Sequence, residues 1–251
     1  MNSNIFFGTY KLLDETILNQ TLKYAYEVGY RMFDCAELYK NQHMIGNFFK
    51  VNNIPRDSYW LTSKVSFRTI PKGEQAIRGS IEKTLRDLDT SYLDLMLIHA
   101  PVKNDTLAWE ILTEYKNNGI IKNIGISNYN IDNLTRFINC IQNKDIYCNQ
   151  IEFNPFLNRL ELIELCKSKN IKLISYGNLY KKNDLIICIS KNICKTPEQI
   201  LLKYALQKDF SIIATSTVLD YIRENYSLDF TIDIDELDKL NENFSLYKRF
   251  L

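Results

Sequence analysis

Four titratable side chains in the first hundred residues lie at or just beyond the ends of short apolar runs: Asp34, Tyr39, Lys64 and His99. Three of them directly end such a run, which is unusual because a charge at the end of a buried strand must be paired or solvated. If these runs are neighbouring parallel strands, their carboxyl ends lie side by side. We therefore predict that the four side chains lie close together at the carboxyl ends of these strands.

These four side chains are suited to proton transfer onto an oxygen atom. A tyrosine alone has a pKa near ~10 and is a poor proton donor at neutral pH. The Lys64 ammonium beside the Tyr39 hydroxyl would lower that pKa, and the Asp34 carboxylate would keep the lysine charged and oriented. His99 could hydrogen-bond a carbonyl oxygen and direct it at the tyrosine. The set predicts a general acid for an oxygen that gains charge as its carbon receives hydride.

A purely structural reading of the same residues is also open. Asp34 and Lys64 could be a buried structural ion pair and His99 a hydrogen-bonded residue at a strand end, since structural ion pairs also perturb pKa values. For any single residue this reading is preferable. The occurrence of all four at strand ends or just beyond favours a catalytic role over a structural one.

The elements that would position these residues alternate along the whole chain, 1–251, without a linker or low-complexity tract. The patterns predict strands at about 5–7, 31–34, 59–64, 93–99, 120–127, 147–152, 171–176 and 211–214. They predict helices at about 15–28, 41–49, 71–88, 107–115, 131–141, 160–169, 197–207, 219–226 and 235–241.

Alternation of strands and helices implies parallel pairing and right-handed crossovers. Eight such units in 251 residues suit a closed (β/α)8 TIM barrel of the α/β class, as a single domain, better than an open doubly wound sheet. The segment Gly8-Thr9-Tyr10 after the first strand does not supply a Gly-x-Gly-x-x-Gly pattern, which disfavours a dinucleotide fold of that kind.

Composition excludes several classes of function. The net charge of +1 argues against nucleic acid or an anionic membrane as a partner, and no apolar run approaches the ~20 residues of a membrane helix. The N-terminus does not resemble a secretory signal, and six cysteines without a Cys-x-x-Cys pair predict reduced, mostly buried thiols of a cytoplasmic protein. Only two histidines occur, so we expect no metal site. Polar helices without an apolar patch are typical of a monomer.

Several segments resemble the signatures of the aldo-keto reductase family, and the likeness covers nearly the whole chain. Two of them differ from the family's signatures: the segment 33–46 has Cys35 for Thr and Gln42 for Glu, and the segment 97–101 has Ala100 for Trp. The segments are Phe33-Asp34-Cys35-Ala36-x-x-Tyr39-x-Asn41 with Gly46, Thr62-Ser63-Lys64, Leu97-Ile98-His99-Ala100-Pro101, Ile124-Gly125-Ile126-Ser127-Asn128-Tyr129 and Asn149-Gln150-Ile151-Glu152-Phe153-Asn154-Pro155.

The resemblance implies a (β/α)8 barrel that reduces small aldehydes or ketones with NADPH, or less often NADH. It implies Tyr39 as the acid, Lys64 and Asp34 as the groups that tune it, and His99 as the orienting residue. The residues that it assigns to the cofactor are Gly8, Thr9, Tyr10, Ser127, Asn128, Gln150, Tyr176, Ser216, Tyr221, Glu224 and Asn225.

Four of these cofactor residues have structural alternatives. Ser127-Asn128 could cap the next helix, Gln150 could bond to backbone, and Tyr176 could belong to the core. Under the resemblance, Ser127, Asn128 and Gln150 would hold the carboxamide, while Tyr176 would stack on the nicotinamide ring.

The chain departs from the family at the site for the extra phosphate of NADP. The family's lysine there is Thr215, and the arginine that stacks on adenine is Tyr221, whereas Glu224 and Asn225 remain. Two lost cations remove charge-assisted bonds worth roughly 1.5–3 kcal/mol each. We expect weaker NADPH binding and less discrimination against NADH than is usual.

The loops also look trimmed. The hairpin that closes the barrel bottom in the family is missing, the loop after 176–179 is nearly absent, and the tail that ends at Leu251 looks short. Because loops set specificity in barrels, we expect a shallow, open site with high Michaelis constants.

Two other functions remain possible from the sequence. Trimmed loops and lost cations could mean a degenerate barrel that binds a nucleotide or a protein and turns over little, although a binding module needs no such set of four groups. An enzyme of phosphorylated metabolites would need a glycine-rich loop after strands seven and eight, where only Gly177 is found.

Overall fold

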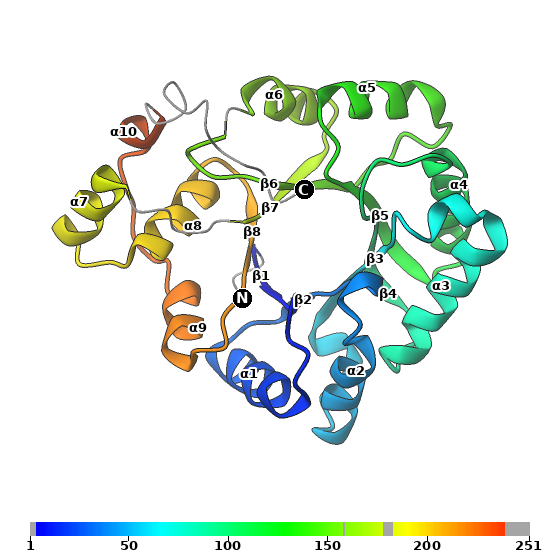
Figure 1. Cartoon of the computed structure of the whole chain (residues 1–251), viewed down its shortest axis with the longest axis horizontal. Coiled ribbons are helices and arrows are strands. Elements are labelled where there is room, and N and C mark those ends of the chain that lie inside the picture. Colours follow the sequence, from blue (N-terminus) through cyan, green and yellow to red (C-terminus); the bar gives the residue numbers. More distant parts are fainter. Residues whose placement is uncertain (1–3, 158, 178–182, 239–251) are drawn as a thin grey trace.

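The computed structural model describes residues 4–157, 159–177 and 183–238. Its eight parallel strands form a closed barrel in which each strand pairs with the next and the last pairs with the first (Figure 1). The expected (β/α)8 barrel is therefore confirmed. The strands are β1 (Ile5–Gly8), β2 (Met32–Asp34), β3 (Trp60–Val65), β4 (Leu93–Ile98), β5 (Ile121–Ser127), β6 (Cys148–Glu152), β7 (Lys172–Tyr176) and β8 (Ser211–Ala214).

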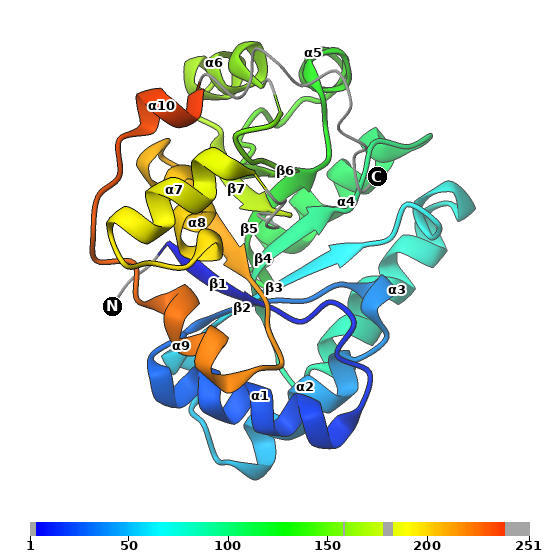
Figure 2. The ribbon, with the colours of Figure 1, turned by 60° about the vertical axis from the view of Figure 1, so that its left-hand side comes forward.

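The helices lie outside the strands and surround them (Figures 1 and 2). They are α1 (Glu15–Val28), α2 (Gln42–Val51), α3 (Glu74–Asp87), α4 (Asp105–Asn117), α5 (Ile131–Cys140), α6 (Leu160–Ser168), α7 (Asp184–Asn192), α8 (Pro197–Gln207), α9 (Leu219–Tyr226) and α10 (Ile234–Asp238). Within the described residues there are also three short 3-10 helices, η1 (Glu37–Tyr39), η2 (Arg56–Ser58) and η3 (Ile70–Lys72).

Local sequence signals place most of the helix ends where they were expected. The Asp14 side chain accepts a hydrogen bond from the Ile17 amide and so caps α1. Gly29 ends that helix with a φ of 123°, a backbone conformation that favours glycine. Thr196 caps α8 in a capping box, with Pro197 in the first turn.

Two predictions about the helices were wrong. Pro71 does not open α3, because it lies in η3 and Gly73 then turns the chain before Glu74. The helix α7 was not predicted at all, although its apolar residues follow a helical period about as clearly as those of α1. Asn183 begins it by accepting hydrogen bonds from the Leu185 and Ile186 amides. The predicted trimming of the segment after β7 and of the chain end concerns residues 178–182 and 239–251, which lie outside the described residues.

The core has two layers that follow from the alternation of side chains along each strand. Phe6, Leu95, Leu97 and Cys148 belong to a small cluster that fills the barrel interior, whereas neighbours such as Met96 belong to the large cluster between the strands and the helices. Because the interior is packed, the barrel has two separate ends rather than a pore.

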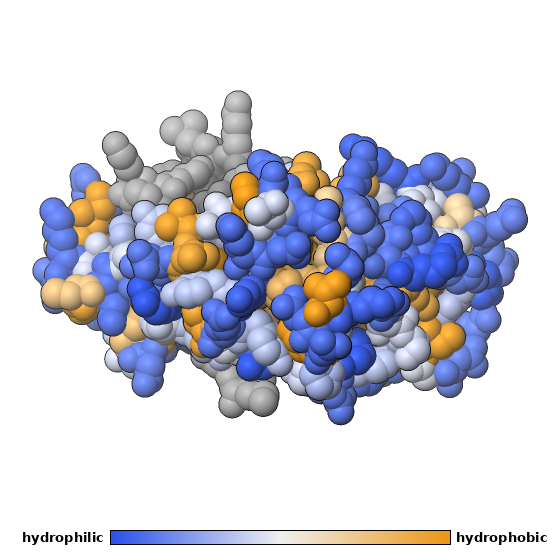
Figure 3. Space-filling model, turned by 90° about the horizontal axis from the view of Figure 1, so that it is seen from below, coloured by the Kyte–Doolittle hydropathy of each residue, from blue (hydrophilic) through white to orange (hydrophobic). Residues whose placement is uncertain are grey.

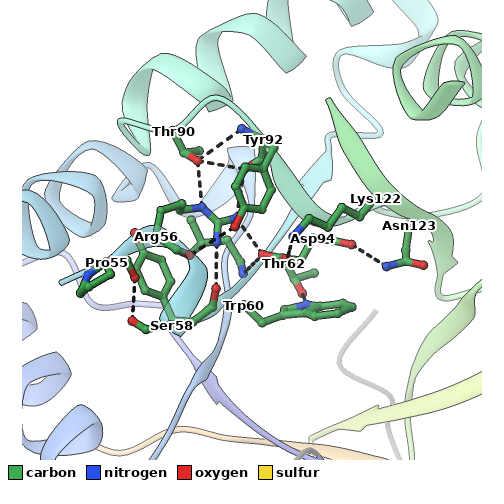
Figure 4. Close-up of polar contacts among 12 residues, drawn as sticks. Pro55, Arg56, Ser58, Trp60, Thr62, Thr90, Tyr92, Asp94, Lys122 and Asn123 are labelled. Atoms are coloured by element: carbon green, nitrogen blue, oxygen red, sulfur yellow. Dashed lines mark hydrogen bonds and ion pairs between the residues drawn. The ribbon is translucent and has the colours of Figure 1, made fainter. Parts of the chain in front are cut away.

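An ion-pair network closes the amino end of the barrel wall (Figure 4). The Arg56 guanidinium donates to the Asp94 carboxylate over 2.7 Å, and the Lys122 ammonium reaches the other Asp94 oxygen over 3.2 Å. The Leu61 amide also donates to Asp94, over 2.9 Å. These contacts join the start of β3 to the starts of β4 and β5, far along the chain from one another.

A hollow of about 580 Å³ lies at this same end, with Trp60, Tyr147 and Lys172 among its lining residues. In TIM barrels the amino ends of the strands serve stability and the carboxyl ends carry the chemistry. We therefore place the candidate site at the opposite end of the barrel.

The cysteines correct one expectation from composition. All six thiols are free, but only Cys35, Cys148 and Cys166 are buried, and the other three are exposed. The prediction of mostly buried thiols therefore holds for half of them. In the described part of the chain, no helix combines the length and the apolar character that crossing a membrane requires.

Candidate active site

The carboxyl ends of β2, β3 and β4 bring the four predicted side chains together. The Lys64 Nζ lies 2.5 Å from Asp34 Oδ1 and 3.3 Å from the Tyr39 hydroxyl. The Tyr39 and His99 rings lie 5.9 Å apart at an interplanar angle of 78°. Residues spread over 65 positions of the sequence thus surround one point.

Lys64 is fully buried, and its ammonium donates to three acceptors. These are the Asp34 carboxylate, the Tyr39 hydroxyl and the Cys35 carbonyl oxygen, the last over 2.9 Å. Burial is the largest single influence and would lower the pKa of Lys64, but the charges and hydrogen bonds of Asp34 and Tyr39 together outweigh it and raise that pKa above its ordinary value. Lys64 is therefore a permanent cation beside the phenol.

The pKa of Tyr39 differs from the expectation. Burial of the phenol raises the pKa above its ordinary value, and the Lys64 ammonium lowers it only in part. The negative charge of Asp34 and the Cys35 thiol act in the same direction as burial. The sequence-based expectation of a net lowering is wrong, because it counted the lysine and not the desolvation.

His99 is neutral at physiological pH. Burial, followed by the positive charge of Lys64, lowers the pKa of its imidazole to about 3. Its Nδ1 is buried and has no hydrogen-bond partner among the described residues. The ring lies between Tyr39 and Phe67, whose ring is 6.2 Å away. His99 can thus donate or accept a hydrogen bond as a neutral imidazole, but it is a poor source of a proton.

We expect this buried imidazole to make the free energy of unfolding fall at acidic pH. The unfolded imidazole titrates near ~6.5, and the folded one at about 3. The unfolded state therefore binds the extra proton between these values, so stability is complete above pH ~6.5 and is lost as the pH falls toward the folded pKa. The loss at pH 5 is roughly 2 kcal/mol, from about 1.4 kcal/mol per pH unit.

Urea unfolding of the wild type and of His99→Gln at pH 7 and pH 5 measures this effect. The variant should lose roughly 2 kcal/mol less than the wild type between the two pH values, because glutamine does not titrate. An identical pH dependence in the two proteins would contradict a neutral, buried His99.

The residues expected at the carboxamide form a connected polar group beside the four. Ser127 Oγ donates to the Gln150 carbonyl oxygen over 2.9 Å, and the Tyr176 hydroxyl donates to Asn128 Oδ1 over 2.6 Å. The Asn128 amide donates to the His99 carbonyl oxygen over 2.9 Å, and Asn128 has a left-handed φ of 66°. Ser127 and Asn128 therefore link β5 to β4 and β6, and Asn130, not Asn128, caps α5.

Gln150 makes a contact that was not predicted. Its Nε2 donates to the second carboxylate oxygen of Asp34 over 2.8 Å, from 116 positions away in the sequence. Both side chains are buried. Asp34 thus receives Lys64 on one oxygen and Gln150 on the other.

The segment after β1 lies beside the four side chains and beside the segment after β8. Thr9 Oγ1 donates to the Asp34 carbonyl oxygen over 2.9 Å, and the exposed Tyr10 ring lies 5.1 Å from the Tyr39 ring. A Cβ atom on Gly8 would lie 2.3 Å from Thr215 Oγ1, so only glycine permits this close approach.

The remaining predicted residues lie on or just before α9. Ser216 Oγ accepts from the Val218 amide over 3.0 Å and so turns the chain into the helix. Tyr221 is exposed, Glu224 is half-buried and Asn225 is buried. These residues follow β8 in the chain, and Thr215, which precedes them, lies beside Gly8.

Three residues around the four were missed by sequence reasoning. Glu37 accepts three hydrogen bonds from the segments after β3 and on α3. Phe67 contacts His99, and Asn41 donates to the Thr9 and Leu12 carbonyl oxygens over 2.8 and 3.0 Å. Glu37 and Asn41 stand within the same motif as Tyr39, which was the available signal.

A cavity of about 240 Å³ adjoins Asn128 and Tyr176, and among the described residues its lining does not include the side chains of Asp34, Tyr39, Lys64 and His99. Among its lining residues are Ala100, Asn128, Glu152, Arg159 and Tyr176, which come from the ends of several strands and the loops that follow. Its place at the carboxyl ends is the usual place of an active site in a TIM barrel.

Comparison with known proteins identifies the fold and the family. The sequence profile described as the aldo/keto reductase family matches residues 4–183. The chain belongs to the aldo/keto reductase family. The methylglyoxal reductase DkgB of Escherichia coli O157:H7 is 30% identical over 240 residues, which cover 92% of this chain and 88% of that protein. Prostaglandin F synthase 1 of Bos taurus is 29% identical over 289 residues, covering 96% and 88%.

Solved structures of the family share the fold of this aldo-keto reductase. The aldose reductase from Schistosoma japonicum has a TM-score of 0.88 and 26% identity, and the match covers 98% of this chain and 90% of that one. An aldo/keto reductase from Brucella melitensis has a TM-score of 0.88 and 26% identity, covering 95% of each chain. The protein is an oxidoreductase that reduces carbonyl groups, in a family that generally uses NAD(P)H.

Proposed function

We propose that this aldo-keto reductase converts a small aldehyde or ketone to an alcohol with Tyr39 as the general acid. The observation that carries the proposal is the 3.3 Å contact of a permanently charged Lys64 with the Tyr39 hydroxyl, next to a neutral His99. NAD(P)H, when bound, supplies the hydride that the carbonyl carbon receives.

The residues of the chain fit a nicotinamide cofactor. Amide and hydroxyl groups of Ser127, Asn128 and Gln150 lie at the carboxyl ends of adjacent strands. Because the Gln150 Nε2 is engaged with Asp34, we propose that its Oε1 accepts a hydrogen bond from the carboxamide. Tyr176 would cover one face of the nicotinamide.

In this mechanism the chain orients the carbonyl and moves one proton. His99, as a neutral imidazole, hydrogen-bonds the carbonyl oxygen and holds it near Tyr39. The Tyr39 hydroxyl gives its proton to that oxygen as negative charge develops, and Lys64 stabilises the phenolate that remains. Asp34 holds Lys64 in place, and solvent later returns the proton to Tyr39.

Consumption of NADPH or NADH by the purified protein with a reactive aldehyde tests the proposal. Methylglyoxal is the first substrate to try, because bacterial relatives about 30% identical are named for its reduction. We expect turnover that depends on the aldehyde. The absence of turnover with either cofactor across aromatic, aliphatic and 2-oxo aldehydes would contradict it.

We propose that cofactor preference is weak because Thr215 and Tyr221 stand where the family has cations. We expect similar dissociation constants for NADPH and NADH in the wild type. Thr215→Lys should tighten NADPH binding by roughly 10-fold or more and leave NADH unchanged, because one charge-assisted bond contributes about 1.5–3 kcal/mol.

Quenching of the Trp60 and Trp109 fluorescence by each cofactor measures these constants. Thr217→Lys, an exposed threonine of the same segment, is the control for a general effect of positive charge. A wild-type protein with a strong preference for NADPH would contradict the prediction.

We also propose that the whole chain, 1–251, acts as one cytoplasmic, monomeric domain. Support comes from the free thiols and from the face shown in Figure 3, where apolar residues form small separate patches among hydrophilic ones. Size-exclusion chromatography with light scattering tests the monomer, and a dimer at micromolar concentration would overturn it.

A further inference from the structure

Glu37 is a half-buried acid whose carboxylate joins three segments. Its Oε2 accepts from the Ser66 amide over 2.8 Å and from Ser80 Oγ over 2.9 Å, and its Oε1 accepts from Thr69 Oγ1 over 2.6 Å. Ser66 and Thr69 belong to the loop after β3, and Ser80 belongs to α3. Hydrogen bonds to an ionised acceptor are among the strong ones, so this carboxylate is a firm link.

The turn that begins at Glu37 also carries Tyr39. It is the three-residue 3-10 helix η1, which follows extended Ala36 and is closed by Lys40 in the left-handed conformation with a φ of 58°. Such a short helix has little stability of its own. Apart from the Glu37 carboxylate, the turn is held by backbone hydrogen bonds, by the ring contacts of Tyr39 and by the hydrogen bond from Lys64 to the Tyr39 hydroxyl. The place of the phenol therefore depends on tertiary contacts.

The loop that Glu37 binds carries the other side of the site. Ser66 lies two residues after Lys64, and the next residue, Phe67, packs against His99. The Glu37 carboxylate thus links the turn of Tyr39 to the loop after Lys64. The same loop contains Phe67, which packs against His99. The 3.3 Å contact between Lys64 Nζ and the Tyr39 hydroxyl is close to the limit of a hydrogen bond, so a small shift of the turn would break it.

We propose that Glu37 is a positioning residue that holds Tyr39 in register with Lys64 and His99. The proposal rests on the role of Tyr39 proposed above. Glu37 acts through its hydrogen bonds and not through its negative charge. Loss of the link lets the phenol move away from Lys64, which removes the part of the pKa lowering that Lys64 supplies.

Glu37→Leu and Glu37→Gln separate position from charge. The Thr69 and Ser80 hydroxyls can accept from an amide as well as donate, so glutamine keeps the link and leucine does not. We expect Glu37→Leu to lower kcat by roughly 10–100-fold, the scale of a misplacement of about 1 Å. Glu37→Gln should stay within about threefold of the wild type on the same scale. KM and the cofactor dissociation constants should change little in both.

The pH profile of alcohol oxidation supplies a readout that a general loss of stability would not move. In that direction Tyr39 must be deprotonated to accept a proton, so the rate rises with pH. In Glu37→Leu the rise should occur at higher pH than in the wild type. Glu74→Leu is the matched control, because Glu74 is an exposed acid at the start of α3 that pairs with Arg78.

Several results would overturn the proposal. A wild-type kcat and pH profile in Glu37→Leu would show that the link is unnecessary, and a Glu37→Gln as defective as Glu37→Leu would show that charge is the agent. If Glu37→Leu does not fold, the double variant Thr69→Val/Ser80→Ala removes two of the same hydrogen bonds and must show the same kcat loss and alkaline shift. If the wild type is active, Tyr39→Phe is impaired and Glu37→Leu is normal, only the role of Glu37 is refuted. If Tyr39→Phe is active, the proposed role of Tyr39 as the general acid is refuted instead.

Discussion

Tyr39→Phe is expected to lower kcat for carbonyl reduction by roughly 10²–10⁴-fold, the usual contribution of a positioned general acid. The change removes only the hydroxyl, which accepts a hydrogen bond from the Lys64 ammonium over 3.3 Å. The ring contacts to Tyr10 and His99 remain, so the shape of the site is preserved. Neutral His99, with a pKa of about 3, is a poor replacement as proton donor at pH 7.

Steady-state rates and cofactor titrations of the same preparations measure this effect. The dissociation constants of NADPH and NADH should stay near the wild-type values, since the lost hydroxyl acts on the substrate oxygen. Tyr92→Phe is the control, because its hydroxyl lies at the amino end and contacts the Arg56 carbonyl oxygen at 3.4 Å. If Tyr39→Phe keeps kcat within tenfold of the wild type, another group is the acid.

Asp94→Ala is expected to lower the free energy of unfolding by about 3–5 kcal/mol, the cost of breaking a buried ion pair from one side. The Asp94 side chain is 8% exposed and that of its partner Arg56 is 19% exposed. The substitution leaves the Arg56 guanidinium (Figure 4) without its acceptor. The Leu61 amide loses the same acceptor. Water can restore only part of these interactions, because the Leu61 amide is buried and the Arg56 side chain is only 19% exposed.

Urea unfolding compares Asp94→Ala with Asp209→Ala. Asp209 pairs with Lys167 over 3.2 Å, but both side chains are more than half exposed, so its removal should cost less than about 1 kcal/mol. Both variants should keep the wild-type kcat while folded, since Asp94 lies at the end of the barrel opposite Tyr39. A cost as small as that of Asp209→Ala would contradict the structural weight of the Arg56–Asp94 pair.

The barrel was predictable because its signals are local. Alternating apolar strands and amphipathic helices can be recognised in short windows, and parallel strands must share one carboxyl end. That rule alone predicted that Asp34, Lys64 and His99 lie together at the carboxyl end of the barrel, as they do in the structure. Helix α7 was missed although it carries local signals of the same kind, an apolar face with a helical period and the cap by Asn183 at its start.

The energetics of the site were not predictable in the same way. The pKa of Tyr39 depends on how completely its neighbours exclude water, and burial outweighs the lysine that the sequence makes obvious. The partners of Gln150 and Glu37 lie up to 116 and 43 positions away, in segments whose approach no local pattern describes.

The order of residues by itself therefore determined the class of fold, the family and the chemical types gathered at one end of the barrel, because each follows from short-range patterns and motif spacing. The tertiary structure alone decided which oxygen of Asp34 faces Lys64 and which faces Gln150, that His99 is uncharged, and that a carboxylate at position 37 secures the turn of Tyr39. The physical reason is that hydrogen-bond geometry and desolvation depend on three-dimensional packing between distant segments, which residue type and spacing do not specify.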